Sequence, residues 1–349
     1  MNAETPVLGT TDLNIGYRNR RGKDTIVGEE IEVTLHSGEL ICLLGPNGSG
    51  KSTLIRTLAG MQSPLAGGIE LFGDPVSELS NKEIAKRLST VLTERITIGN
   101  LTVYTLVAFG RSPYTGWLGT LSQQDKEKVH WALESTGLSD FAGRDISKLS
   151  DGERQKVMIA RALAQDTSVI LLDEPTAHLD LPNRVEIIRL LRKLAHETGK
   201  GILLSTHELD LALKAGDRIW LMNNEKDLME GVPEDMVLDG TFEKAFARDS
   251  FDFDRATGSF NIHRKQDRKI VLEGDKVPVF WTERALEREG YRTVDRRDNI
   301  PAVHAEETKN GYRWMIIEGE ERAELHSIQG LIEYLRTQKE QAISAGLSG

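Results

Sequence analysis

A glycine-rich stretch near the N-terminus has the residue types and spacing that bind phosphate groups. It reads Gly-Pro-Asn-Gly-Ser-Gly-Lys-Ser-Thr over residues 45–53 and fits the pattern G-x-x-x-x-G-K-[ST]. Glycines let backbone N–H groups approach phosphate oxygens, and a helix that begins near Lys51 adds the positive end of its dipole. Lys51 can reach the β- and γ-phosphates of a nucleotide, and the Ser52 hydroxyl can be a ligand of Mg²⁺. The predicted nucleotide-binding residues of this loop are Gly45, Asn47, Gly48, Gly50, Lys51, Ser52 and Thr53.

A second acidic site is predicted at the end of an apolar run. Residues 169–172 read Val-Ile-Leu-Leu, and Asp173 and Glu174 follow them. Such a run is typical of a buried strand, and Asp173 at its tip can hold Mg²⁺. Glu174 can orient or deprotonate an attacking water. An apolar run followed by Asp-Glu is weak evidence alone, but it is strong evidence beside the glycine loop.

The segment Leu-Ser-Asp-Gly-Glu at residues 149–153 lies at the start of a predicted helix, shortly before this strand. It resembles the signature sequence of the ABC-type ATPases, usually written LSGGQ. Ser150 and Gly152 match that motif, and Asp151 and Glu153 depart from it.

Three further positions resemble motifs of the same family. Asp180, in a Leu-Asp pair, resembles the residue of the aspartate loop. His207, which ends a Ser-Thr-His segment after an apolar run, resembles the switch histidine. Tyr17 resembles the aromatic residue that stacks on adenine; the alternative is a strand tyrosine that packs on its neighbours. The resemblance covers about residues 5–250, with the motifs in the family's order.

The resemblance implies a head-to-tail dimer that closes on two ATP molecules with Mg²⁺ and opens on hydrolysis. In such a dimer one copy presents Lys51, Ser52, Asp173, Glu174 and His207 to the other copy's Ser150 and Gly152. The predicted catalytic residues are Glu174 and His207, and the predicted Mg²⁺ ligands are Ser52 and Asp173. This arrangement is physically reasonable, because a helix N-terminus with a Ser hydroxyl and a Gly can bind an anion such as a phosphate.

One family position is altered. The family normally has a glutamine after the strand that here spans residues 88–92, and gapless matching places Thr93 there, followed by Glu94. That glutamine contacts the Mg²⁺ site and senses the membrane partner. Thr93 is too short to do both, so we predict that Glu94 or a water replaces it.

Residues 101–114 indicate what the ATPase powers. Their sequence, LTVYTLVAFGRSPY, resembles the segment TV-x-x-LV-x-x-GR-x-P of ATPases that drive import of iron chelates, haem and cobalamin. The resemblance implies a permease dimer in the membrane and, indirectly, a periplasmic substrate-binding protein. A ferric siderophore or citrate-type complex is favoured over haem or cobalamin. The alternative for this segment is a plain amphipathic helix and turn.

Two other classes of function remain to be compared. A soluble ABC-type ATPase that acts on a ribosome or DNA usually has two nucleotide domains or a long coiled-coil insertion. This chain has one glycine loop and one signature, and residues 60–149 hold no long heptad run. A P-loop kinase would leave the segment 150–153 unexplained. Import is therefore the favoured function.

The first 250 residues predict an α/β fold with a parallel sheet core. Short runs that are apolar on both faces alternate with helical patterns, as expected of central strands covered by helices. The expected central strands are 41–44, 169–172 and 202–204, and the expected neighbouring helices are 52–59 and 183–196. Residues 7–40 predict an N-terminal antiparallel β subdomain. Residues 97–165 predict a helical subdomain, with one helix over 122–136 and another from about residue 152.

Residues 255–349 predict a small α+β domain of regulatory or partner-contact function. The expected strands are 259–263, 269–272, 303–306 and 312–317, and the expected helices are 282–289 and 328–339. Four aromatic residues are predicted to lie in its core, because a small domain needs large side chains; the alternative is a ligand patch. They are Trp281, Tyr291, Tyr312 and Trp314.

Charge, cysteine content and the length of apolar runs limit which partners and locations are expected for this chain. The 349 residues carry a net charge of −10, so no basic face is evident and no nucleic-acid partner is predicted. A single cysteine, Cys42, excludes an intramolecular disulfide and is expected in a buried strand. No apolar run approaches the ~20 residues that span a bilayer, and the N-terminus lacks a signal-peptide pattern. We expect a peripheral protein at the cytoplasmic face of the inner (plasma) membrane.

Overall fold

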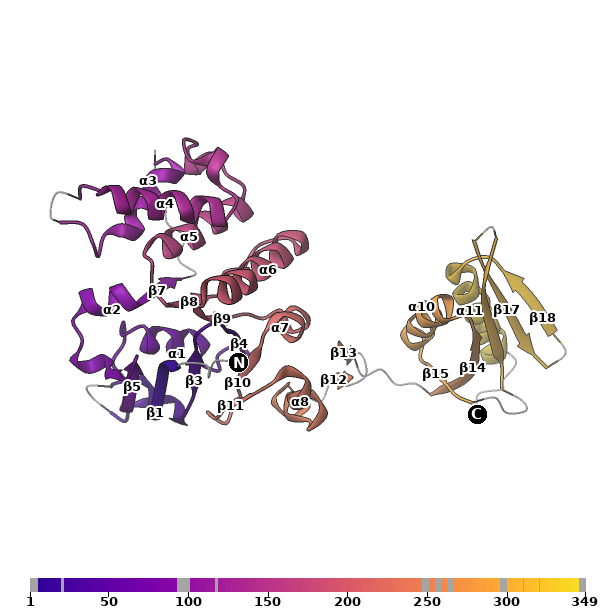
Figure 1. Cartoon of the computed structure of the whole chain (residues 1–349). Coiled ribbons are helices and arrows are strands. Elements are labelled where there is room, and N and C mark those ends of the chain that lie inside the picture. The colour runs from indigo at the N-terminus through magenta and orange to yellow at the C-terminus, as the bar shows by residue number, and fades with distance from the viewer. Residues whose placement is uncertain are drawn as a thin grey trace. The chain divides into compact units, whose positions relative to one another are not determined.

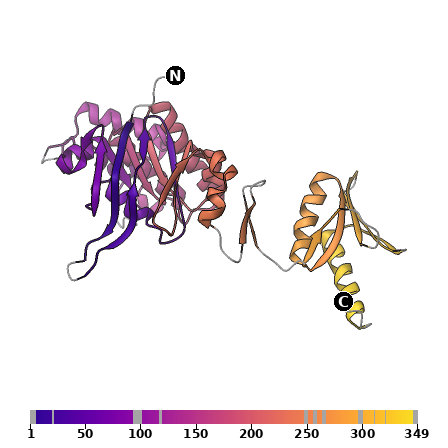
Figure 2. The same cartoon turned by 90° about the horizontal axis from the view of Figure 1, so that it is seen from below.

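The chain folds into two units, Met1–Asn261 and Ile262–Gly349, shown from two directions in Figures 1 and 2. The computed structural model describes residues 6–19, 22–92, 101–116, 119–246, 251–254, 259–262, 267–295, 300–309, 311–319 and 321–344. Within these ranges, none of the helices has the length and apolar character that a membrane span requires.

A six-stranded sheet forms the centre of the first unit, in the order β11-β10-β4-β9-β8-β7. Every neighbouring pair from β10 to β7 is parallel, and β11 is antiparallel to β10. The three strands predicted as central are buried along their whole length. The strands are β4 (Leu40–Leu44), β7 (Leu88–Val91), β8 (Val169–Asp173), β9 (Gly201–Ser205), β10 (Arg218–Met222) and β11 (Leu228–Gly231). The predicted α/β fold is confirmed.

Alternate residues of the central strands contribute to two cores on opposite faces of the sheet. Ile41 and Leu43 pack with Leu54 of the first helix, and Cys42 and Leu44 pack on the other face. The first face carries α1 (Lys51–Leu58) and the N-terminal strands. The second face carries α5 (Asp151–Ala164), α6 (Leu181–Thr198) and α7 (Leu209–Ala215).

An antiparallel sheet forms from the N-terminal strands in the order β2-β1-β5-β6, with β3 paired to β1. The predicted N-terminal antiparallel β subdomain is confirmed, and within it Ile31, Val33 and Leu35 are buried while Glu32 and Thr34 are more exposed. The elements here are β1 (Pro6–Tyr17), β2 (Thr25–Ile31), β3 (Thr34–His36), β5 (Ala66–Leu71), β6 (Asp74–Pro75) and α2 (Asn81–Arg87).

Three helices, α3 (Val103–Ala108), α4 (Gln123–Ser135) and α5, pack together at one end of this unit (Figure 1). The helix predicted over residues 122–136 is confirmed as α4; Ser122 caps it, and Asp125 completes a capping box by accepting from the Ser122 backbone N–H. Asp125 also accepts a hydrogen bond from Arg111 Nε at 2.8 Å, and both side chains are buried. Arg111 donates further to the carbonyl of Ala164 in α5 at 2.8 Å. One buried ion pair therefore ties the three helices together.

The second unit is a five-stranded sheet with two helices on one face. Its core joins Ile270, Leu286, Val303, Trp314 and Leu331. The predicted small α+β domain is confirmed, with two short strands, β15 and β18, that the sequence did not reveal. The strand predicted over 259–263 forms β13 (Ser259–Ile262), which lies outside this sheet. Its elements are β14 (Arg268–Gly274), α10 (Lys276–Arg288), β15 (Tyr291–Thr293), β16 (Ala302–Thr308), β17 (Gly311–Glu318), β18 (Glu321–Leu325) and α11 (Ile328–Ser344).

Along the described part of the chain, four short elements follow the central sheet and precede this domain. The elements are α8 (Pro233–Leu238), α9 (Thr241–Phe246), β12 (Phe251–Asp254) and β13 (Ser259–Ile262). Phe253 of β12 stacks on Phe242 of α9, with ring centroids 5.8 Å apart, and both belong to the core on the helix-covered face of the central sheet.

The prediction of four core aromatic residues in the second unit is half wrong. Trp314 and Tyr291 are buried, and Trp314 Nε1 donates to Thr282 Oγ1 at 2.6 Å. Trp281 is 54% exposed and Tyr312 is 42% exposed. Trp281 precedes Leu286 by five residues in α10, which places the two side chains about 140° apart around the helix, so Trp281 faces away from the core that contains Leu286.

Replacing Asp125 with asparagine should leave the Arg111 guanidinium buried without a counter-charge. We expect the free energy of unfolding to fall by about 3–5 kcal/mol, measured by urea unfolding. The control is Asp166→Asn, which breaks the half-exposed Lys128–Asp166 pair of equal length, 2.8 Å, and should cost about 0–1 kcal/mol. Equal effects of the two changes would contradict a special role for the buried pair.

Candidate active site

A cavity of about 380 Å³ brings the glycine loop together with residues from three distant parts of the chain. The loop contributes Asn47, Gly48, Gly50, Lys51, Ser52 and Thr53, and the distant residues are Tyr17, Glu174 and His207. The volume lies in the range of small-molecule sites. Most residues predicted to surround a nucleotide therefore line one cavity.

Local backbone geometry explains why the loop needs glycine at its end. Gly50 precedes α1 with a φ of 104°, in the left-handed region. A Cβ atom there would lie 2.2 Å from Val27 Cγ1 of β2, so no other residue fits. The close contact holds the first turn of α1, and with it Lys51 and Ser52, against the cavity.

Lys51 is held inside the loop by the loop's own carbonyl groups. Its Nζ donates to Gly45 O at 2.8 Å and Pro46 O at 3.1 Å. Burial lowers the pKa of Lys51, while the carboxylates of Glu174 and Asp173 act in the opposite direction. The buried Ser49 hydroxyl has no hydrogen-bond partner among the described residues. A buried cation beside an unsatisfied hydroxyl suits an anionic ligand.

Oxygen ligands suitable for Mg²⁺ meet at the edge of this cavity. Ser52 Oγ donates to Asp173 Oδ1 at 3.1 Å, and Ser205 Oγ donates to the same oxygen at 2.8 Å. A hydroxyl beside a carboxylate is the hard oxygen set that Mg²⁺ prefers, and Mg²⁺ usually takes few protein ligands. The residues present fit the ion.

Glu174 is held in a strained backbone conformation that fixes its direction. Its φ is +49°, in the left-handed region that non-glycine residues rarely adopt. Its backbone N–H donates to Ser205 Oγ at 2.9 Å, and its carboxylate lies 2.7 Å from His207 Nε2. The hydroxyl of Ser205 thus links Asp173 to Glu174. The sequence showed Ser205 beside the histidine but suggested no role for it.

Tyr17 stands at the end of β1 with its ring 52% exposed. Its hydroxyl lies 3.0 Å from Thr53 Oγ1. The hydroxyl contact fixes the ring at the cavity wall while leaving a face open, which suits stacking on a planar base.

Ser150, Gly152 and Asp180 do not line this cavity; they lie at the N-terminal ends of α5 and α6. Ser150 caps α5, and its hydroxyl donates to Glu153 Oε2 at 2.9 Å. The Ser150 backbone N–H also donates to Glu153 Oε2 at 2.7 Å, and the Glu153 backbone N–H donates to Ser150 Oγ at 3.2 Å; these two bonds form a capping box. These hydrogen bonds from Ser150 lower the pKa of Glu153. The departure from the family motif at Glu153 therefore has a structural role.

Asn183 joins the two segments that carry these residues. A Cβ atom on Gly152 would lie 2.5 Å from Asn183 Oδ1, so the glycine leaves room for this side chain. Asn183 Nδ2 donates to Asp180 Oδ1 at 2.5 Å, and the Asn183 backbone N–H donates to the same oxygen at 3.2 Å. Nothing in the sequence singled out Asn183, because its contact with Gly152 exists only in the folded chain.

Two further predictions concern residues 93–94 and the segment 101–114. Thr93 and Glu94, predicted to replace the family's glutamine, lie outside the described residues. The segment 101–114 forms α3 and a 3-10 helix, Phe109–Arg111. Phe109 is 49% exposed, and Tyr114 is 38% exposed with the Arg111 guanidinium 3.9 Å from its ring centroid.

The fold and the order of the motifs define an ABC-type ATPase, and comparison with known proteins agrees. Residues 29–177 match the family model described as ABC transporter, and residues 267–336 match the iron ABC transporter C-terminal domain. An iron(3+)-hydroxamate import ATP-binding protein of Bacillus subtilis is 35% identical over 243 residues, which cover 70% of this chain and 88% of that protein. A cobalamin import ATP-binding protein of Halobacterium salinarum is 36% identical over 273 residues, which cover 78% of this chain and 67% of that protein.

A solved structure shows the same fold. It is a dimeric ATP-binding cassette in a post-hydrolysis state with ADP and Pi, 26% identical, with a TM-score of 0.56 over 65% of this chain and 98% of that chain. The chain belongs to the ATP-binding proteins of ABC transporters, and it is an ATPase that energises transport.

The contact between Gly152 and Asn183 predicts a double-mutant cycle. Gly152→Ala alone should lower the free energy of unfolding by about 1–3 kcal/mol, because the new methyl group displaces Asn183 from Asp180. In an Asn183→Ala background the same change should cost nothing or stabilise the helix. Thermal unfolding of the four proteins measures this. An equal loss in both backgrounds would show that the contact has no effect.

Proposed function

We propose that this chain is the energising subunit of a membrane importer, bound at the cytoplasmic face of the membrane to a permease dimer. One observation supports this most directly. The phosphate loop, Glu174 and His207 line the cavity, and Asp173 is bonded to Ser52 at its edge, whereas Ser150, Gly152 and Asp180 lie at two helix N-termini outside it. An ATP site divided in this way is completed by a second copy of the chain.

In the proposed mechanism, two copies pack head to tail with ATP at each of two sites. Lys51 and the loop N–H groups bind the β- and γ-phosphates, and the Tyr17 ring stacks on adenine. The N-terminus of α5, with Ser150 and Gly152, binds the γ-phosphate from the opposite side. Mg²⁺ held by Ser52 and Asp173 would neutralise charge on the phosphates.

Glu174 then acts on the attacking water. Its carboxylate accepts the water proton or orients the water, and the 2.7 Å contact with His207 holds it in place. Loss of the γ-phosphate removes the anion between the copies, so the dimer opens. The opening and closing drive the permease through its transport cycle.

The cargo we propose is a ferric siderophore or another iron chelate. The matched iron ABC transporter C-terminal domain, the hydroxamate-importing relative and the segment 101–114 all favour it. The cobalamin-importing relative supports the alternative of cobalamin. A periplasmic substrate-binding protein would deliver the cargo to the permease.

The helical segment that would contact the permease has a rigid base and an exposed edge. Arg111 is buried and bound to Asp125, and Phe109 and Tyr114 are the exposed aromatic residues beside it. This combination suits docking of a short permease helix. We assign the cassette to about residues 5–250, with the helical subdomain at 97–165. Residues 255–349 form a separate regulatory or partner-contact module.

Glu174→Gln tests the proposal. The change removes the water-activating carboxylate, so ATP hydrolysis should fall by about 10²–10⁴-fold while ATP binding persists and traps the closed dimer. We expect a polytopic membrane protein to co-purify from membranes with ATP and Mg²⁺. The matched control is Glu186→Gln, which alters an exposed glutamate of α6 outside the cavity and should behave as the wild type. Recovery of ribosomes or nucleic acid without a permease would contradict the import function.

A further inference from the structure

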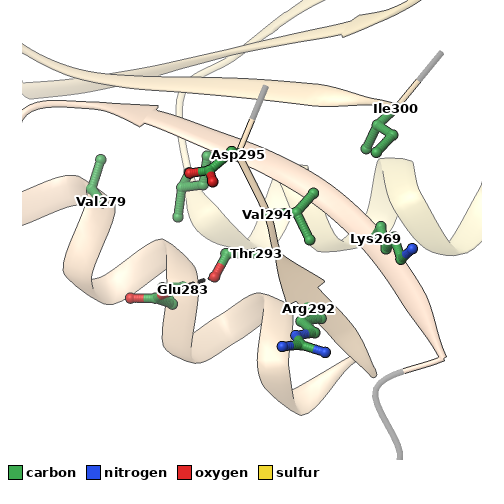
Figure 3. Close-up of a pocket in the computed structure, with 9 residues that line it drawn as sticks. Lys269, Val279, Glu283, Arg292, Thr293, Val294, Asp295 and Ile300 are labelled. Atoms are coloured by element: carbon green, nitrogen blue, oxygen red, sulfur yellow. Dashed lines mark hydrogen bonds between the residues drawn. The ribbon is translucent and has the colours of Figure 1, made fainter. Parts of the chain in front are cut away.

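A cavity of about 570 Å³ lies at the edge of the sheet in the second unit (Figure 3). The strand order, β15-β14-β16-β17-β18, makes β15 the edge strand. This strand has three residues, and its register with β14 runs from Arg268–Tyr291 to Ile270–Thr293. The chain leaves the sheet after Thr293, so a hollow forms between the rest of β14, the flank of α10 and the residues that follow β15.

The hollow has an apolar floor. Leu272 of β14, Val279 of α10, Val294 and Ile300 line it, and all four side chains are half-buried. A partly apolar concave surface with a few polar groups is the usual form of a small-molecule site.

Two cations lie on one side of the hollow without a counter-charge. Lys269 and Arg292 are register partners on adjacent strands, so their like charges are neighbours. Within the described ranges neither side chain has an ion pair or a hydrogen bond. Other arginines of this unit are paired, such as Arg313 with Glu306 and Arg336 with Glu289. The unpaired cations therefore favour a bound carboxylate or another anion.

Two carboxylates lie on the other side, toward Val279 in the view of Figure 3. Glu283 Oε1 accepts a hydrogen bond from Thr293 Oγ1 at 2.7 Å, which fixes its position. Asp295 has no partner in the part of the chain that the structure describes. Cations and carboxylates thus line one cavity without pairing with each other. A simple anion would satisfy the cations but would be repelled by the carboxylates.

We propose that this cavity binds a small zwitterion of the amino-carboxylate class. The ligand's carboxylate binds Lys269 and Arg292, and its ammonium group binds Glu283 and Asp295. Its carbon chain covers the floor formed by Leu272, Val279, Val294 and Ile300. The site lies wholly in the second unit and uses no residue of the ATP cavity, so it stands whether or not the import function holds.

Calorimetric titration of the full-length protein tests the proposed ligand class. The probes are L-leucine and the ω-amino acids from glycine to 6-aminohexanoate. Each is compared with the analogue that lacks the ammonium group, such as pentanoate for 5-aminopentanoate, and with the analogue that lacks the carboxylate, such as pentylamine. At least one amino acid should bind about tenfold more tightly than both of its analogues, the effect of losing one charge-assisted hydrogen bond. Equal binding of the amine-free analogue, or no binding by any probe, would overturn the proposal.

Variants locate the site. Lys269→Gln and Arg292→Gln should each lower the affinity for the tightest-binding amino acid about tenfold. Glu283→Gln should lower that affinity while leaving the affinity for its amine-free analogue unchanged. The matched control is Lys276→Gln, which removes an exposed charge of the same unit outside the cavity and should leave affinity unchanged. All four positions are at least partly exposed, so thermal unfolding of each free variant should match the wild type. Equal loss in the control and the cavity variants would place the ligand elsewhere.

Discussion

The order of three neighbouring parallel strands, β9 between β4 and β8, determines which residues meet at the nucleotide cavity. The carboxyl ends of parallel strands lie at one edge of a sheet, and this is where α/β proteins bind ligands. The glycine loop follows β4, Asp173 and Glu174 end β8, and His207 follows β9. Residues separated by more than 120 positions in the chain, such as Ser52 and Asp173, therefore come within hydrogen-bond distance. The apolar runs that form these strands thus determine the catalytic geometry.

The other residues predicted to bind nucleotide are positioned by helix packing rather than by the ends of strands. Ser150 and Asp180 begin two helices that pack on the opposite face of the same sheet, and Asn183 bridges them. Because Asn183 contacts both Gly152 and Asp180, the two helix ends form one rigid surface. A rigid surface of this kind suits recognition of an anion that a second copy presents. Glu153 keeps Ser150 bonded in the single chain, so the proposed binding of a phosphate at Ser150 would compete with that capping interaction.

Much of the first unit could be predicted from sequence because its signals are local. Four aliphatic residues before Asp173 indicated a buried strand, and the helical pattern over residues 122–136 indicated the helix that became α4. Asn183 and Ser205 were missed because their roles depend on contacts between distant segments. In the second unit, Trp281 was predicted to be buried, because the helix was expected only over residues 282–289 and the helical period was not applied to residue 281. The strand β18 was missed because its sequence, Glu-Arg-Ala-Glu-Leu, lacks the apolar alternation of a strand.

The central claim is that the two halves of one ATP site come from two copies of the chain, and site-directed cross-linking tests it most directly. Cys42 is buried, and burial raises its pKa to about 12, so it does not compete for thiol reagents. Asn47→Cys in the loop and Asp151→Cys at the start of α5 would place exposed thiols on the two halves. With a short bismaleimide in the Glu174→Gln background, we expect a covalent dimer that requires ATP and Mg²⁺ and is absent from the proteins with one new cysteine. A protein that stays monomeric with ATP, or cross-links equally without it, would contradict the account.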